Sequence, residues 1–174
     1  MHPLDKFKHC PVCGSERFNI NDGKSKRCAD CGYEYYLNPS SANAALVVNN
    51  KHELLVERRG REPQKGMLDL PGGFADICET AEQGVIREVE EETGLRVARA
   101  EYLFSFPNTY LYSGLVVPTL DLFFRCHVTD LTTLRADDDA AEVMWIPLQE
   151  VCPDDFAFDS IRKGVTKFLK TVNA

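Results

Sequence analysis

One 23-residue segment, Gly73–Leu95, carries charged residues and glycines at spacings that rarely arise by chance. The positions that define the pattern are Gly73, Glu79, Arg87, Glu88, Glu91, Glu92 and Gly94. If each residue type occurs at a frequency of about 5–7%, seven matches in fixed register arise roughly once in hundreds of millions of starting points. The segment therefore constrains both the local fold and the chemistry of the chain.

The second half of this segment is predicted to be a helix over residues 80–93. Thr80 and Gln83 have the spacing of a capping box, in which the side chain of each residue caps the backbone of the other. Gly94 has the residue type that commonly ends a helix. At 100° per residue, the glutamates fall on one stripe of the helix and the aliphatic residues on the neighbouring stripe.

The acidic stripe indicates a divalent cation. Glu88, Glu91 and Glu92 are spaced i, i+3 and i+4, and each like-charge pair costs an isolated helix about 0.2–0.5 kcal/mol. Carboxylates with water and substrate phosphates suit magnesium or manganese. Gly84, one turn before Glu88, is expected to leave room for an ion or a phosphate. The alternative for a glutamate-rich helix is an ordinary solvated face.

Gly73–Leu95 resembles the Nudix box, G-x5-E-x7-R-E-U-x-E-E-x-G-U with U aliphatic, at every defined position. The resemblance implies an α/β/α sandwich and cleavage of a diphosphate linkage in a nucleoside diphosphate joined to another group, with Mg²⁺ or Mn²⁺ required. It also implies that the metal ligands are Glu88, Glu91, Glu92 and the carbonyl of Gly72. By the same resemblance, Arg87 orients this cluster by pairing with Glu79 or Glu91.

Hydrolysis requires a carboxylate that accepts a proton from the attacking water. In the Nudix family this base is sometimes a box glutamate and sometimes an acid from a distant loop. The distant candidates here are Glu142 and the run 137–139, which consists of three aspartates. We expect the base to be Glu142, Glu91 or Glu92; the alternative for the aspartate run is a solvated loop.

A second motif lies near the start of the chain. Cys10, Cys13, Cys28 and Cys31 form two C-x-x-C-G knuckles, a spacing close to that of zinc sites. Four thiolates close a tetrahedral zinc site and leave no position for water, so the zinc is expected to be structural. Residues 1–38 are therefore predicted to be a zinc ribbon, and residues 39–174 the Nudix hydrolase domain. The alternatives are a redox pair or disulfides.

Composition and charge restrict partners and location. The chain has 174 residues and a formal net charge of −7. Residues 1–38 carry +1 and residues 39–174 carry −8, which argues against a broad nucleic-acid-binding face. No hydrophobic signal or membrane span is evident, so we expect a cytoplasmic protein with a small nucleotide substrate and no membrane partner. Whether it forms a homodimer is open.

The remaining pattern predicts a mixed sheet between helices. Expected strands are 44–48, 53–57, 97–106 and 120–128, a second helix covers about 159–170, and 37–41 is the expected linker. Candidate phosphate-binding cations are Arg58, Arg59, Arg61 and Lys65, for which surface solubility is the alternative. Candidate base-stacking aromatics, which are otherwise core or interface residues, are Phe74, Tyr110, Tyr112, Tyr33, Tyr35 and Tyr36.

A zinc ribbon before a Nudix box resembles the NADH pyrophosphatases and some enzymes that act on other dinucleotides. The NADH group carries S-Q-P-W-P-F-P-x-S after the box, whereas residues 105–110 here read SFPNTY. The resemblance therefore favours a dinucleotide or ADP-ribose-like substrate without specifying NADH. Two alternatives are an enzyme that removes a nucleotide cap from RNA and a ligand-sensing regulator, although no helix-turn-helix is evident in the sequence.

Overall fold

The computed structural model describes residues 2–131, 134 and 140–172 of the chain. It divides into two compact units, Met1–Pro39 and Ser40–Ala174. The predicted acidic residues Asp137, Asp138 and Asp139 lie outside the described residues. Among the helices in the described ranges, none is long and apolar enough to cross a bilayer.

The smaller unit is a three-stranded antiparallel sheet with the order β1-β2-β3. Its strands are β1 (Phe18–Asp22), β2 (Ser25–Cys28) and β3 (Glu34–Tyr36). Its core consists of Cys10, Phe18 and Cys28, with Phe7 and Tyr35 packed against them. Because so small a core buries little apolar surface, a metal crosslink between the cysteines would supply stability that packing alone does not.

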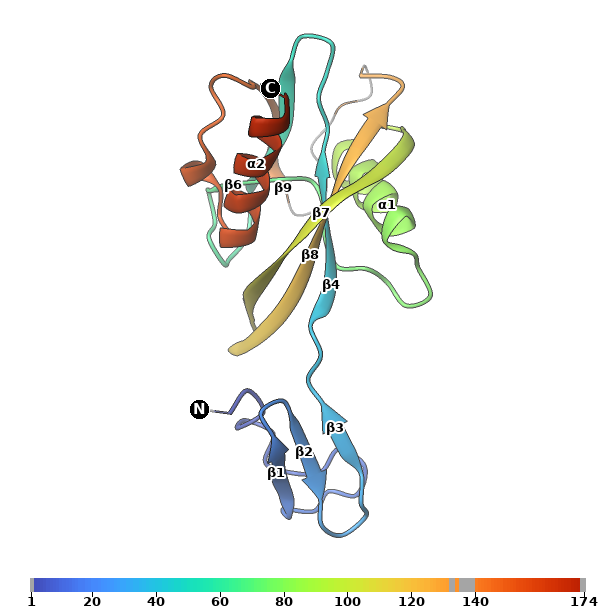
Figure 1. The fold of residues 1–174 in the computed structure, drawn as a ribbon, viewed down its shortest axis with the longest axis vertical. Helices are drawn as coiled ribbons and strands as arrows, with labels where there is room; N and C mark the ends of the chain where they lie inside the picture. The colour runs from blue at the N-terminus through green and yellow to red at the C-terminus, as the bar shows by residue number, and fades with distance from the viewer. Residues whose placement is uncertain (1, 132–133, 135–139, 173–174) are drawn as a thin grey trace. The chain divides into compact units, whose positions relative to one another are not determined.

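Within its described residues, the larger unit has six strands in two sheets, with a helix on each side (Figure 1). The mixed sheet has the order β4-β8-β7, in which β4 (Ser40–Leu46) is parallel to β8 (Leu115–Val128), and β8 is antiparallel to β7 (Val97–Tyr112). The second, antiparallel sheet has the order β6-β5-β9. Its strands are β5 (Glu53–Arg59), β6 (Leu68–Asp69) and β9 (Ala140–Pro147).

Alternating residues of the strands form two hydrophobic cores. Helix α1 (Ala81–Thr93) packs into one core through Val85 and Val89, and helix α2 (Asp159–Val172), which follows a 3-10 turn at Pro153–Asp155, packs into the other. Neighbouring phenylalanines of β8 show the alternation, since Phe124 belongs to the α1 core and Phe123 to the α2 core. The predicted α/β/α sandwich with a mixed sheet is confirmed.

Helix α1 has the predicted ends. The Thr80 hydroxyl accepts a hydrogen bond from the Gln83 backbone N–H at 3.2 Å, and the Gln83 side chain accepts one from the Thr80 N–H at 2.9 Å. Gly94 caps the other end in the left-handed conformation, with φ of 70°. These contacts fix where the acidic stripe begins and ends.

Strands β7 and β8 are longer than predicted, and β6 and β9 were not predicted as strands. The extra length comes from a hairpin around Ser113 and Gly114, which both have positive φ, as a tight two-residue hairpin turn requires. Pro107 and Pro118 interrupt the hydrophobic pattern, so the strand lengths predicted from the sequence are too short. Tyr110 and Tyr112 consequently lie within β7, and β4 begins inside the predicted linker, at Ser40.

The packing of α2 on the sheet depends on Gly164. A Cβ atom at this position would lie 2.2 Å from Cε1 of the buried Phe123 ring. A Gly164→Ala change gains roughly 1 kcal/mol of helix propensity, but overpacking a core costs about 1–3 kcal/mol. We expect a net loss of stability and a lower melting temperature by circular dichroism. Lys170→Ala, at an exposed position of the same helix, should leave it unchanged; equal melting of both variants would contradict this account.

Candidate functional site

A cleft of about 890 Å³ opens in the larger unit. It is bordered by β4, β5, the loop that precedes α1, the β7–β8 hairpin and the start of α2. Its volume falls within the usual range for small-molecule sites, about 300–1,000 Å³. We call the part lined by Glu57, Glu88 and Glu92 the acidic end, and the part lined by Arg59 and a group of aromatic rings the aromatic end.

Three carboxylates line the acidic end: Glu57 from β5 and Glu88 and Glu92 from α1. Glu92 is 9% exposed, and its Oε2 accepts a hydrogen bond from the Gly72 N–H at 2.8 Å. Burial raises the pKa of Glu92 well above its usual range, and the neighbouring Glu57 raises it further. Burial likewise raises the pKa of Glu57 and of Glu88. The cleft therefore holds carboxyl groups whose ionised form is poorly solvated and would be stabilised by a cation.

The loop residues Gly72 and Gly73 allow the backbone to approach this end closely. A Cβ at Gly73 would lie 2.6 Å from Glu88 Oε1. A Cβ at Gly72, whose φ is +150°, would lie 2.0 Å from the Asn43 carbonyl oxygen. On either side of Gly72, the Pro71 and Gly73 carbonyls accept hydrogen bonds from β4, whereas no donor among the described residues reaches the Gly72 carbonyl. That oxygen and the carboxylates form a donor set that fits a hard cation such as Mg²⁺.

Gly84 has a different role from the predicted one. A Cβ at this position would lie 2.6 Å from Asn43 Nδ2 and 2.9 Å from Glu79 Oε2. The space that glycine leaves is thus needed by two protein side chains, and the expectation that it leaves room for an ion or phosphate is not supported by the geometry.

Arg87 connects the acidic residues of the box. Its guanidinium donates to both oxygens of Glu79 at 2.9 and 3.1 Å, to Glu88 at 2.9 Å and to Glu91 at 3.0 Å. It also donates to the Phe74 carbonyl at 3.3 Å. The hydrogen bond with Glu79 is the main reason that the pKa of Arg87 is raised. The expected pairing of Arg87 with Glu79 and Glu91 is present.

Two other acids named from the sequence, Glu91 and Glu142, do not line the cleft. Glu91 is 58% exposed and pairs with Arg87, on a surface outside the cleft. Glu142 lies in β9 opposite Arg58, and the two side chains pair at 3.3 Å. Neither Arg58 nor Glu142 borders the cleft, because successive side chains of a strand point to opposite faces and Glu57 points into it. Glu142 is thus a strand residue and not the loop residue that we expected.

Of the four candidate cations, Arg59 and Arg61 line the cleft, and Arg58 and Lys65 do not. Arg59 is held from three sides. It donates to Asp69 at 2.7 Å and to the Pro63 carbonyl at 2.8 Å, and it lies 4.8 Å from the centre of the Phe158 ring. This guanidinium is therefore positioned before any ligand arrives.

The aromatic side chains of the cleft form one cluster around Tyr110. The rings of Phe74 and Phe158 lie 5.9 and 5.5 Å from that of Tyr110, and Tyr112 lies 6.5 Å from it. The structure thus brings together the predicted Phe74, Tyr110 and Tyr112. The other predicted aromatics, Tyr33, Tyr35 and Tyr36, belong to the smaller unit.

Four residues that line the cleft were not predicted from the sequence: Asn43, Glu57, Asp69 and Phe158. These residues come from β4, β5, β6 and the start of α2, and no motif connects them. The sequence feature that could have identified such residues is a polar residue within or directly after an apolar run, such as Glu57 after Leu54–Val56. Asn43 is 4% exposed, and neither its Oδ1 nor its Nδ2 has a hydrogen-bond partner among the described residues.

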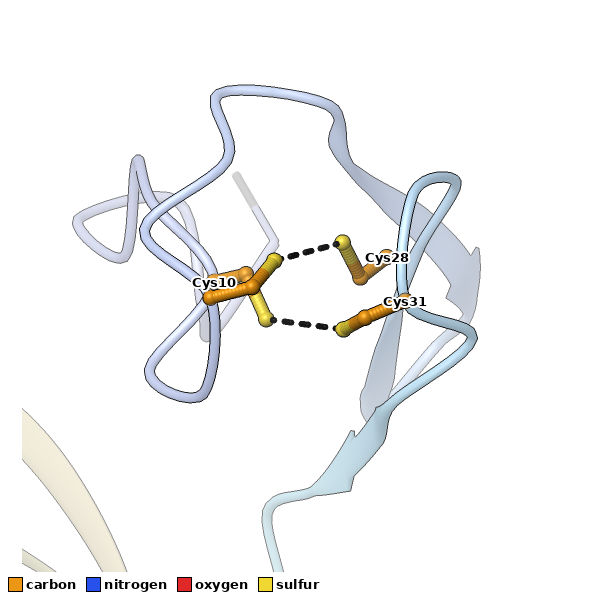
Figure 2. A group of neighbouring side chains, drawn as sticks. Cys10, Cys28 and Cys31 are labelled. Carbon is orange, nitrogen blue, oxygen red and sulfur yellow. Dashed lines mark hydrogen bonds between the residues drawn. The ribbon is translucent and has the colours of Figure 1, made fainter.

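The four predicted cysteines converge in the smaller unit (Figure 2). Within the described residues, they are the set of potential ligands whose atoms all lie within 4.8 Å of one another. Sulfur–sulfur distances are 3.7 Å for Cys10–Cys31 and 3.6 Å for Cys13–Cys28. A Zn–S bond of about 2.3 Å gives a tetrahedral edge of about 3.8 Å, so the thiols fit a zinc ion.

The two knuckles have matching backbone geometry. Gly14 and Gly32, with φ of 74° and 75°, donate backbone hydrogen bonds to the carbonyls of Cys10 and Cys28. The pKa of Cys28 is lowered to about 7, mainly by the backbone N–H of Cys31, which favours the thiolate that binds metal. The site is suited to a structural zinc.

The zinc hypothesis predicts that a Cys28→Ser variant loses the metal and that residues 1–39 become less stable, because metal binding supplies folding free energy. Elemental analysis of the purified variant should show less than one zinc per chain, and amide exchange should rise in these residues. Cys152→Ser, at an exposed position of the larger unit, is the control. A wild-type protein without zinc, or a variant that retains it fully, would rule the site out.

Comparison with known proteins identifies the family. The NUDIX domain model matches residues 38–168. The chain is 43% identical over 144 residues to the ADP-ribose pyrophosphatase of Methanocaldococcus jannaschii, covering 78% of each protein.

Other relatives and a solved structure agree. The chain is 33% identical over 117 residues to the NAD-capped RNA hydrolase NudC of Haemophilus influenzae, covering 63% of this chain but only 44% of that relative. The crystal structure of a NUDIX hydrolase from Nitrosomonas europaea superposes with a TM-score of 0.72 at 26% identity, covering 94% of this chain and 90% of that one. The chain belongs to the Nudix hydrolase family.

Proposed function

We propose that this protein hydrolyses the diphosphate linkage of an ADP-ribose-like compound or a dinucleotide, using a divalent cation. The observation that carries the proposal is the cleft itself. Its lining contains the carboxylates Glu88 and Glu92 together with Arg59 and the aromatic cluster. A substrate with a diphosphate next to a base has parts that match both groups.

The acidic end supplies the reaction site. Glu88, Glu92 and the Gly72 carbonyl would hold the cation, which when bound neutralises phosphate charge and lowers the pKa of a coordinated water. Glu91 would also bind the cation if its side chain left the ion pair with Arg87. The rotatable bonds of the Glu91 side chain allow this movement. Arg87 and the glycine loop keep Glu88 and Glu92 in place.

A carboxylate near the reaction site must take the proton from the attacking water. The candidates remain Glu91, Glu92 and Glu142. The pairing of Glu142 with Arg58 away from the cleft favours a box glutamate. On this basis we expect Glu142→Gln to reduce turnover less than a substitution at Glu91 or Glu92 does.

The aromatic end would select the nucleotide. Phe74 is 43% exposed and Tyr110 is its edge-on neighbour, so either ring can stack on a base. Arg59 can donate to a phosphate while Asp69 and Phe158 hold it. The name of the Methanocaldococcus relative, ADP-ribose pyrophosphatase, supports this substrate class.

A second candidate is the removal of a dinucleotide cap from RNA. The NudC relatives bear the name NAD-capped RNA hydrolase, but this chain spans about half of their length or less. The net charge of −8 over residues 39–174 opposes binding of a polyanion. A gel-shift titration with RNA at low salt separates the two candidate functions. A salt-dependent shift would favour removal of an RNA cap, and the absence of a shift would favour hydrolysis of a free nucleotide.

The proposal predicts the outcome of a substrate screen with Mg²⁺. The products of ADP-ribose, NADH, FAD, dinucleoside polyphosphates, sugar nucleotides and nucleoside triphosphates would be separated by chromatography. We expect the highest kcat/KM for ADP-ribose or a dinucleotide, because these substrates occupy both ends of the cleft. A clear preference for nucleoside triphosphates, or no turnover of any compound, would contradict the proposal.

A Glu92→Gln variant tests the reaction site. We expect kcat to fall by a factor of about 100 or more, whereas the melting temperature should stay near the wild-type value. Glutamine can still accept the Gly72 N–H, and the substitution removes a buried charge next to Glu57. Glu150→Gln, on an exposed turn after β9, is the control. Wild-type kcat in Glu92→Gln would remove Glu92 from the reaction site.

A further inference from the structure

Glu57 is a buried carboxylate with no assigned role. It is the fifth residue of β5, follows three fully buried aliphatic residues and is itself only 7% exposed. Its Oε1 has no hydrogen-bond partner among the described residues. Burying an uncompensated carboxylate is costly, so a residue of this kind at a purely structural position requires an explanation.

The neighbours of Glu57 supply that compensation only in part, since Oε1 stays without a partner among the described residues. Its carboxyl group is in contact with that of Glu92, and Glu88 and Asp69 add further negative charge nearby. The charge of Arg59 acts on Glu57, but the guanidinium of Arg59 already donates to Asp69 at 2.7 Å and to the Pro63 carbonyl. Two buried acids therefore face each other where one would be less costly.

A second unpartnered group lies on the same wall. Asn43 of β4 lines the cleft, is 4% exposed and has neither side-chain polar atom satisfied within the described part of the chain. Its backbone N–H anchors the Gly73 carbonyl, next to the free carbonyl of Gly72. Unsatisfied buried groups of two different strands thus line the same cleft.

We propose that Glu57 is a ligand of the catalytic cation, paired with Glu92 and the Gly72 carbonyl at the acidic end of the cleft. Mg²⁺ usually takes only one or two carboxylates from a protein, together with water and substrate phosphates. Glu57 and Glu92 supply two such carboxylates for one cation, beside the Glu88 carboxylate that the proposed function assigns to it. The inference rests on the proposed function, which requires a cation here, but it adds a ligand from outside the box.

The proposal predicts that losing the Glu57 carboxylate favours the cation-free protein and weakens the binding of the cation. Without the cation, Glu57→Gln removes a poorly solvated carboxyl group that faces Glu92, so the variant should melt at or above the wild-type temperature. With the cation, it loses a negative ligand, and its affinity should fall by a factor of about ten or more. A structural carboxylate would give the reverse: a lower melting temperature and unchanged affinity.

The test is a Mn²⁺ titration followed by electron paramagnetic resonance of the free ion, on the full chain with its zinc in place. Soft thiolates prefer Zn²⁺ over Mn²⁺, so the cysteine site should not compete. The control is Glu53→Gln at the other end of β5, whose carboxylate accepts a hydrogen bond from Asn49 and does not line the cleft. Zinc content is measured in every variant.

The inference is supported if the Mn²⁺ dissociation constant rises about tenfold or more in Glu57→Gln and stays within twofold in Glu53→Gln. A change within twofold in Glu57→Gln overturns it. If Glu57→Gln does not fold, Glu57→Asp replaces it. This variant keeps the charge but withdraws the carboxylate by about 1.5 Å, and it should also weaken Mn²⁺ binding about tenfold; unchanged affinity would overturn the inference.

The result is separable from the proposed function. If Glu57→Gln binds Mn²⁺ as tightly as wild type while wild type hydrolyses ADP-ribose, the inference alone is wrong. If wild type binds no Mn²⁺ under conditions where the chain is folded, both the inference and the proposed function are wrong.

Discussion

The Arg87 guanidinium is the interaction on which the acidic end of the cleft depends. It is shared among Glu79, Glu88 and Glu91 and also holds the Phe74 carbonyl. Without a fixed positive charge, carboxylates at i, i+3 and i+4 would repel one another. Because the contacts with Phe74 and Glu79 reach the segment before α1 and those with Glu88 and Glu91 reach the helix, Arg87 also keeps the glycine loop against α1. A lysine could not do this, since it lacks the planar fork of donors.

The positions of the glycines follow from this arrangement. The loop can approach Glu88 and Glu92 only because Gly72 and Gly73 have no side chains to obstruct it. Gly84 gives Asn43 and Glu79 room beside the helix, so it supports the same network from the opposite side. The strands then complete the cleft. They bring Glu57 to the box glutamates and hold Arg59, through Asp69, next to the aromatic cluster.

The features that could be predicted from the sequence depend on residues close together in the chain, and those that could not depend on how the strands are oriented. The ends of α1 and the contacts of Arg87 depend on residues close in sequence, and both were predictable from spacing. The side of a strand to which a residue points was not, because an apolar run such as Leu54–Val56 is buried on both faces and has no alternation to read. For this reason Glu57 was overlooked, and Arg58 could not be told apart from Arg59.

The most direct test of this account is a crystal of the protein soaked with Mn²⁺ and a non-hydrolysable methylene analogue of ADP-ribose. The account predicts an anomalous peak within bonding distance of Glu92 and the Gly72 carbonyl, in contact with the diphosphate of the analogue. The adenine ring should lie on Phe74 or Tyr110. A manganese peak remote from Glu92, or a diphosphate bound outside the cleft, would contradict the account.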